Sequence, residues 1–222
     1  MTARAFADLL GADERGVLIR AGQRRHHPVR AMLLAEGDDG HQVLVIRTGY
    51  VKVVASMRGH EVVLDVLGPG DLLGEVAAID DGPRSASAIA LSSVEVVAIP
   101  GPSFVAVLDG HPSIERSLRL HLARRLREAS HRQVEYGALD AIGRVAARLV
   151  ELTDRFGVLD GDRWTLTAPL TQADLAGWAG LSREATVKAL RTMRQRHWVE
   201  TGQRAIVIRD LGAIREVAAV RG

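Results

Sequence analysis

Cysteine is absent from the 222-residue sequence, which excludes disulfide bonds, thiolate zinc sites, cysteine nucleophiles and cysteine-ligated iron–sulfur clusters. No apolar run is long enough to span a bilayer. Asp8 interrupts the segment in which a signal peptide needs unbroken apolar residues. These absences predict a cytoplasmic protein without a membrane partner.

Metal-binding and catalytic motifs are also absent. None of the eight histidines lies four residues from another, and no H-E-x-x-H pattern occurs, so we expect no metal site. The adjacent His26 and His27 stand in an Arg-rich stretch that we interpret as a solvated loop. Because there is neither a G-x-S-x-G elbow nor a P-loop, we do not expect an enzyme.

Charge is distributed unevenly along the chain. Residues 1–113 contain 10 Lys and Arg against 14 Asp and Glu, whereas residues 114–222 contain 19 against 13. The net charge is therefore −4 in the first part and +6 in the second. This asymmetry indicates that the second part binds a polyanion such as nucleic acid.

The first half of the chain reads as short strands separated by turns. β-branched residues dominate four segments, at 43–46, 50–54, 61–64 and 94–99. Gly, Pro and Asp separate these segments, as in Gly68-Pro69-Gly70. Many short strands with regularly spaced turns predict a β-roll of the jelly-roll type, and the helices that follow make the expected fold class α+β.

A long helix is predicted after the strands. Pro112 suits a helix start, and neither Pro nor Gly occurs in residues 113–136. One apolar stripe runs along this helix, at Ile114, Leu118, Leu122, Leu126 and Ala129. A narrow stripe on a long exposed helix is best explained by pairing with a second copy, so we expect a homodimer with Leu118, Leu122 and Leu126 at its seam.

The remaining residues predict a winged helix-turn-helix. The expected elements are a helix over 141–155, a strand over 164–167, helices that begin at Thr171 and Ser182, a hairpin over 197–209 and a helix over 211–220. Thr171 is a good N-cap, and Thr201-Gly202 suits the turn of the hairpin. The Gly180-Leu181 turn joins the two helices of the helix-turn-helix.

Residues 182–188 carry side chains of the kinds that can read DNA bases. If Ser182 is the N-cap, Arg183 and Glu184 stand at a helix N-terminus that enters a major groove. Arginine matches the two acceptors of guanine, glutamate accepts from the amino group of cytosine, and Lys188 reaches a phosphate or a guanine. Thr171 and Gln172 are expected at the same DNA surface. The other interpretation of this segment is an ordinary charged helix start.

A second group of residues suits an anionic ligand. A short helix that begins near Gly74 presents free amide groups to an anion. Arg84 supplies a planar fork for a phosphate, Ser85 adds a hydroxyl, and Glu75 accepts from a sugar hydroxyl. The alternative is a structural Glu75–Arg84 ion pair without a ligand. Because Arg84 is expected in a loop, its replacement by leucine is expected to leave the fold intact.

These motifs resemble those of the cyclic-AMP receptor protein / fumarate-nitrate regulator superfamily of bacterial transcription regulators. The pattern G-E-x-A … P-R-S-A matches residues 74–77 and 83–86, and the motif S-R-E-x-x-x-R is matched at residues 182–188 except at its last position. The resemblance covers nearly the whole chain. It implies a sensor domain over 1–112, a dimerisation helix over 113–138 and a DNA-binding domain over 139–222.

The resemblance also implies a function and its partners. We expect a homodimeric regulator that binds double-stranded DNA and RNA polymerase, requires no cofactor, and responds to cAMP or a related cyclic nucleotide held by Gly74, Glu75, Arg84, Ser85 and Ser130. Relatives that respond to cAMP offer a Thr-Ser pair to the adenine, whereas this chain has Ala129-Ser130, which removes one polar contact. Lys188 stands where the family usually has Arg, and it lacks the bidentate fork.

Two alternative functions stay open. The first is a regulator of the same family that is ligand-independent or takes a different effector. The second is a cyclic-nucleotide-binding module without DNA binding.

Overall fold

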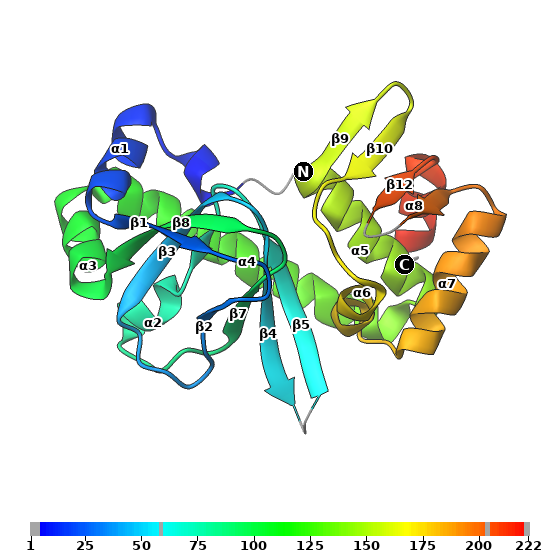
Figure 1. The fold of residues 1–222 in the computed structure, drawn as a ribbon, viewed down its shortest axis with the longest axis horizontal. Helices are drawn as coiled ribbons and strands as arrows, with labels where there is room; N and C mark the ends of the chain where they lie inside the picture. Colours follow the sequence, from blue (N-terminus) through cyan, green and yellow to red (C-terminus); the bar gives the residue numbers. More distant parts are fainter. Residues whose placement is uncertain (1–4, 58–59, 203–204, 220–222) are drawn as a thin grey trace. The chain divides into compact units, whose positions relative to one another are not determined.

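The computed structural model describes residues 5–57, 60–202 and 205–219 (Figure 1). The chain divides into two compact units, Arg4–Arg127 and Glu128–Gly222. The expected α+β fold class is confirmed, with a β-roll first, a long helix next and a winged helix-turn-helix last.

The N-terminal unit is built on two antiparallel sheets, ordered β1-β8-β3-β6 and β2-β7-β4-β5. Their strands are β1 (Gln23–His27), β2 (Met32–Leu34), β3 (Gln42–Thr48), β4 (Val51–Met57), β5 (His60–Leu67), β6 (Leu72–Leu73), β7 (Ser87–Ala90) and β8 (Val94–Pro100). The four strands expected from β-branched segments are confirmed as β3, β4, β5 and β8. Leu44, Ile46 and Val96 are among the buried side chains of one core cluster, to which strands of both sheets contribute.

Short helices cover the first sheet and contribute a second core cluster. They are η1 (Phe6–Leu9), α1 (Ala12–Arg20), α2 (Glu75–Asp80) and α3 (Gly101–Gly110), of which α1 and α3 lie beside β1 and β8 in Figure 1. Phe6, Phe104 and Ile99 are fully buried in this second cluster. Sequence reasoning predicted α2 but missed η1, α1 and α3.

The interpretation of His26 and His27 as a solvated loop is wrong. Both residues belong to β1, where His26 pairs with Glu95 and His27 with Val94 of β8. The strand is polar because it forms the edge of its sheet, so backbone pairing rather than burial of an apolar face holds it in place.

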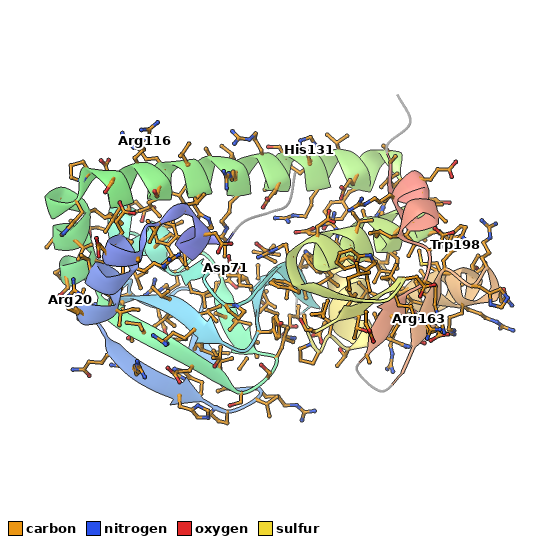
Figure 2. All side chains as sticks on the ribbon, turned by 90° about the horizontal axis from the view of Figure 1, so that it is seen from above. Arg20, Asp71, Arg116, His131, Arg163 and Trp198 are labelled. Carbon is orange, nitrogen blue, oxygen red and sulfur yellow. The ribbon has the colours of Figure 1, made fainter. Side chains whose placement is uncertain are left out.

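The long helix is confirmed as α4 (Pro112–Ala138), which begins at the expected proline. The expected dimer seam needs correction, because Ile114 and Leu118 are buried and Leu122 is packed in the second core cluster of their own unit. Leu126, by contrast, is 70% exposed, and Leu120 and Val134 are exposed too. In Figure 2 the labelled Arg116 projects from this helix away from the sheets.

The C-terminal unit has the expected elements in the expected order, and one further strand, at Gly157–Asp160, that sequence reasoning missed. They are α5 (Ala141–Phe156), β9 (Gly157–Asp160), β10 (Arg163–Leu166), α6 (Gln172–Ala179), α7 (Arg183–Gln195), β11 (Val199–Thr201), β12 (Ile206–Ile208) and α8 (Leu211–Ala218). The strands form one antiparallel sheet, β11-β12-β10-β9. Trp178, Leu149 and Leu175 are fully buried core residues of this unit. The expected hairpin and last helix include Arg204 and Val220, which lie outside the described residues.

Candidate functional site

Arg84 is a buried cation whose fork is held by backbone carbonyls. It is 5% exposed, and its Nη1 donates to the Gly74 oxygen at 2.7 Å while its Nη2 donates to the Gln42 oxygen. Gly74 has a φ of +79°, and a Cβ there would lie 2.2 Å from Arg84 Nη1. The close approach therefore requires glycine at position 74.

The position of Arg84 corrects one expectation. A loop arginine was expected to be replaceable without harm to the fold, but this side chain satisfies two carbonyl oxygens. Leucine would leave those acceptors without their donors, and an unsatisfied buried group costs about 1–3 kcal/mol. Burial lowers the pKa of the Arg84 guanidinium, although the carboxylates of Glu75 and Asp38 raise it, and an arginine stays charged in proteins.

Glu75 is the first residue of α2 and is only 1% exposed. Its Oε1 lies 2.7 Å from Nη1 of Arg125, which comes from α4. The other terminal nitrogen of Arg125 lies 4.0 Å from Oδ2 of the buried Asp65 on β5. Arg125 is a site residue that sequence reasoning missed, because nothing in the sequence pairs a helix residue with a carboxylate 50 positions earlier.

These groups line one cavity of about 250 Å³ within the N-terminal unit. Its polar lining comes from four of the residues discussed here: Glu75, Arg84, Ser85 and Arg125. Aliphatic side chains, among them Leu34, Val53 and Leu122, form the rest of the wall. The structure thus brings Gly74, Glu75, Arg84 and Ser85 together, and an anion with an apolar body matches their chemistry.

Ser130 is the one expected ligand residue that the cavity wall does not include. It is exposed on α4 and belongs to the C-terminal unit, five residues after Arg125. Its role stays a prediction.

The helix-turn-helix follows the expected capping pattern. Thr171 caps α6, since its hydroxyl accepts from the Asp174 amide at 3.1 Å and the Asp174 carboxylate accepts from the Thr171 amide. Gly180 ends α6 with a φ of +62°, which suits glycine. Ser182 then caps α7, its hydroxyl accepting from the Ala185 amide at 3.2 Å.

Helix α7 has one buried face and one charged, exposed face. Thr186, Ala189, Leu190 and Met193 are buried, whereas Arg183, Glu184 and Lys188 are exposed. Hydrogen bonds from its own backbone amide and from Ser182 lower the pKa of Glu184, so it is an anion at neutral pH.

A groove of about 430 Å³ joins the expected DNA-binding residues of α6 and α7. Thr171 and Gln172 line it at the start of α6, and Arg183 lines it at the start of α7. Thr201 and Gly202 of the hairpin complete one side. Three of the six expected DNA-binding residues therefore share a groove. Ser182 and Glu184 flank Arg183 in the sequence, and Lys188 lies on the next turn of α7.

The last residues of α4 attach to the helix-turn-helix within the C-terminal unit. The Tyr136 hydroxyl donates to the Trp178 oxygen of α6 at 3.0 Å. A Cβ at Gly180 would lie 3.3 Å from the Tyr136 ring, so this ring packs against the turn that precedes α7. The nearly buried Arg148 of α5 pairs with Glu135 of α4 and, at 3.1 Å, with Glu151. The end of α4 is therefore fixed to the elements that present α7.

No group of three or more His, Cys, Asp or Glu residues is arranged to hold a metal ion among the residues that the structure describes. Over the same residues, no helix is both long enough and apolar enough to cross a bilayer.

Both units match known domain families. Residues 24–111 match the cyclic nucleotide-binding domain, and residues 143–217 match the Crp-like helix-turn-helix domain. The chain thus combines a cyclic nucleotide-binding domain with a DNA-binding domain, as transcription regulators of the Crp type do.

Whole-chain comparisons agree with the domain matches. The CRP-like cAMP-activated global transcriptional regulator of Mycobacterium tuberculosis is 34% identical over 179 residues, which cover 80% of each chain. The cyclic AMP receptor protein of Thermus thermophilus is 31% identical over 213 residues, which cover 94% of each chain. The solved structure of FixK2 from Bradyrhizobium japonicum has the same fold, with a TM-score of 0.80 at 22% identity over 90% of this chain and 99% of that one. The chain belongs to the cyclic-AMP receptor protein / fumarate-nitrate regulator family of transcription regulators.

Proposed function

We propose that this regulator is a homodimer that binds specific sequences in double-stranded DNA and is controlled by a small anionic effector, a cyclic nucleotide such as cAMP. The observation that carries the proposal is one cavity lined by a buried guanidinium, a buried carboxylate and a hydroxyl. A cyclic nucleotide has a phosphate for Arg84, a ribose hydroxyl for Glu75 and a base for the aliphatic wall. The two relatives described above are named for cAMP, which supports this choice.

Helix α4 connects the proposed effector site to the helix-turn-helix, because one continuous helix carries residues at both. Arg125 of this helix lines the cavity, and Tyr136 of the same helix contacts the helix-turn-helix. A ribose hydroxyl that binds Glu75 would share the carboxylate with Arg125, whose Nη1 lies 2.7 Å from Oε1. An effector shifts the equilibrium between conformations only by its differential affinity, and a bound hydroxyl next to the Glu75–Arg125 pair supplies a contact that differs with and without ligand.

A second candidate is a regulator of this family that does not respond to cAMP. Two observations favour it: Arg84 already satisfies two carbonyls, and Glu75 already has a partner in Arg125. Ala129 also replaces a polar adenine contact of the cAMP-responsive relatives. In this case the cavity is part of the scaffold or accepts a different anion.

Calorimetric titration with cAMP and with cGMP separates the two candidates. The first predicts saturable binding of one nucleotide and tighter binding of selected DNA in a mobility-shift assay when that nucleotide is added. The second predicts DNA binding that neither nucleotide changes. A chain that binds nucleotide but retards no DNA fragment would instead be a module without DNA binding.

Dimerisation is expected to depend on the exposed side of α4. Leu126, Ser130 and Val134 follow Leu118 and Leu122 at a spacing of four, and this stripe, which packs in its own unit at Leu118 and Leu122, is exposed from Leu126 onward. Leu126→Asp would place two carboxylates in a symmetric apolar interface, which we expect to weaken the dimer by about 100-fold or more. Sedimentation equilibrium at micromolar concentration measures the change, from twice the chain mass of 24.0 kDa to a single chain.

Val158→Asp is the matched control, since Val158 is an exposed apolar residue of β9, outside α4. This variant should remain dimeric. Leu122→Asp is a less clear test of the dimer, although Leu122 was expected at the seam, because Leu122 packs against the core of its own unit. A wild-type chain that sediments as a monomer would contradict the proposed dimer.

A further inference from the structure

One apolar side chain lies in the charged, exposed face of α7. This side chain is Val187, which is 38% exposed. It follows the buried Thr186 and precedes the exposed Lys188. Apolar residues of α7 that serve the core, such as Leu190 and Met193, are almost completely buried. Val187 therefore does not have the environment of a core residue.

Helix geometry places Val187 among the residues expected to read bases. Successive residues of an α-helix are rotated by about 100°, so Val187 lies about 40° from Arg183 and about 60° from Glu184 around the helix axis. Arg191, which is exposed, lies about 40° away on the other side. Val187 is thus near the middle of this face and one turn further along the helix than Arg183.

The edges of the base pairs contain one apolar group in the major groove, the C5-methyl of thymine. A valine presents two methyl groups, and its branched Cβ restricts χ1, so little side-chain freedom is lost when it makes a contact. On an exposed helix position, valine adds less helix stability than alanine, so local helix propensity does not explain its presence.

We propose that Val187 is a specificity-determining residue, which contacts the methyl group of one thymine in each half-site, next to the bases read by Arg183 and Glu184. This inference rests on the proposed function of α7 as the recognition helix. The contact made by Val187 adds a preference for a thymine methyl group, which hydrogen-bonding side chains do not supply.

Deoxyuridine provides the test, because it keeps the hydrogen-bonding groups of thymine and lacks only its methyl. The probe is the tightest-binding duplex that wild-type protein selects from random DNA, with each thymine replaced in turn by deoxyuridine. We expect one position per half-site at which the replacement weakens wild-type binding about fourfold, as burial of one methyl group predicts. Val187→Ser, which has similar helix propensity, should bind thymine and deoxyuridine equally at that position.

Val158→Ser on β9 is the matched control, and it should keep the wild-type discrimination. Thermal unfolding confirms that each variant is folded. If wild type binds every deoxyuridine duplex as tightly as the thymine duplex, or if Val187→Ser keeps the difference, the inference is wrong even though Arg183 still reads DNA. If wild type selects no sequence at all, the proposed function fails together with it.

Discussion

Replacement of Arg84 by leucine is expected to weaken cyclic-nucleotide binding by about 100-fold or more, because a charge-assisted contact to the phosphate contributes about 1.5–3 kcal/mol and its guanidinium can make two. The remaining lining of the cavity contains another cation, Arg125, but this one is paired with Glu75. No compensating contact is therefore expected. Calorimetric titration of wild type and variant with the same nucleotide measures the loss.

The same substitution is also expected to destabilise the N-terminal unit. Arg84 donates to the carbonyls of Gly74 and Gln42, and each of these part-buried acceptors that loses its donor costs up to about 1–3 kcal/mol in the free energy of unfolding. Arg84→Lys keeps the charge but not the fork, and should bind nucleotide with an intermediate affinity. The melting temperature of each variant therefore has to be measured beside its affinity.

Arg24→Leu is the matched control, because Arg24 is an exposed arginine of the same unit that lies 4.0 Å from Glu95. It should bind nucleotide as wild type does. If a folded Arg84→Leu variant binds the nucleotide as tightly as wild type, the ligand binds elsewhere. If wild type binds no cyclic nucleotide, the role of Arg84 is purely structural.

Local signals predicted the elements that position both sites. Pro112 marks the start of α4, and Ser182 caps α7 as its sequence context suggests. The glycine at 74 and the arginine at 84 indicated one pocket, and they do line the same cavity. These predictions succeed because caps, turns and glycine conformations depend on neighbouring residues in the sequence.

Contacts between distant elements could not be predicted in the same way. The apolar spacing on α4 identifies one face, but it does not say whether that face meets its own unit or a partner, and Ile114 and Leu118 meet their own unit. The pair formed by Glu75 and Arg125 joins residues 50 positions apart. The polar strand β1 has no alternating apolar pattern, and only its pairing with β8 identifies it as a strand.

Loss of the Arg183 side chain is expected to change which DNA sequences the protein prefers. Arg183 is exposed at the first turn of α7, directly after the Ser182 cap, where a recognition helix meets base edges. A bidentate contact from arginine to guanine discriminates by about 1–3 kcal/mol, and a symmetric dimer makes it in both half-sites. Arg183→Ala should therefore weaken binding to the preferred duplex by about 30-fold or more and remove the preference at one base pair per half-site.

Selection from random DNA with wild type and with Arg183→Ala measures both effects. The wild-type consensus should be a near-palindrome whose half-site centres lie about 34 Å apart, one turn of the duplex. Lys188 lacks the fork of arginine, so Lys188→Arg is expected to sharpen the preference at its own base pair.

The dependence of affinity on salt distinguishes a base contact from a phosphate contact at Arg183. Loss of a phosphate contact weakens all sequences alike and reduces the salt slope by about one, whereas loss of a base contact acts mainly on the preferred sequence. Arg215→Ala is the control for loss of one positive charge in the same unit, because Arg215 lies on α8 and pairs with Asp154. It should leave the consensus unchanged. If Arg183→Ala selects the same base preferences as wild type, the N-terminus of α7 does not read DNA, and the expected roles of Arg183, Glu184 and Lys188 have to be abandoned together.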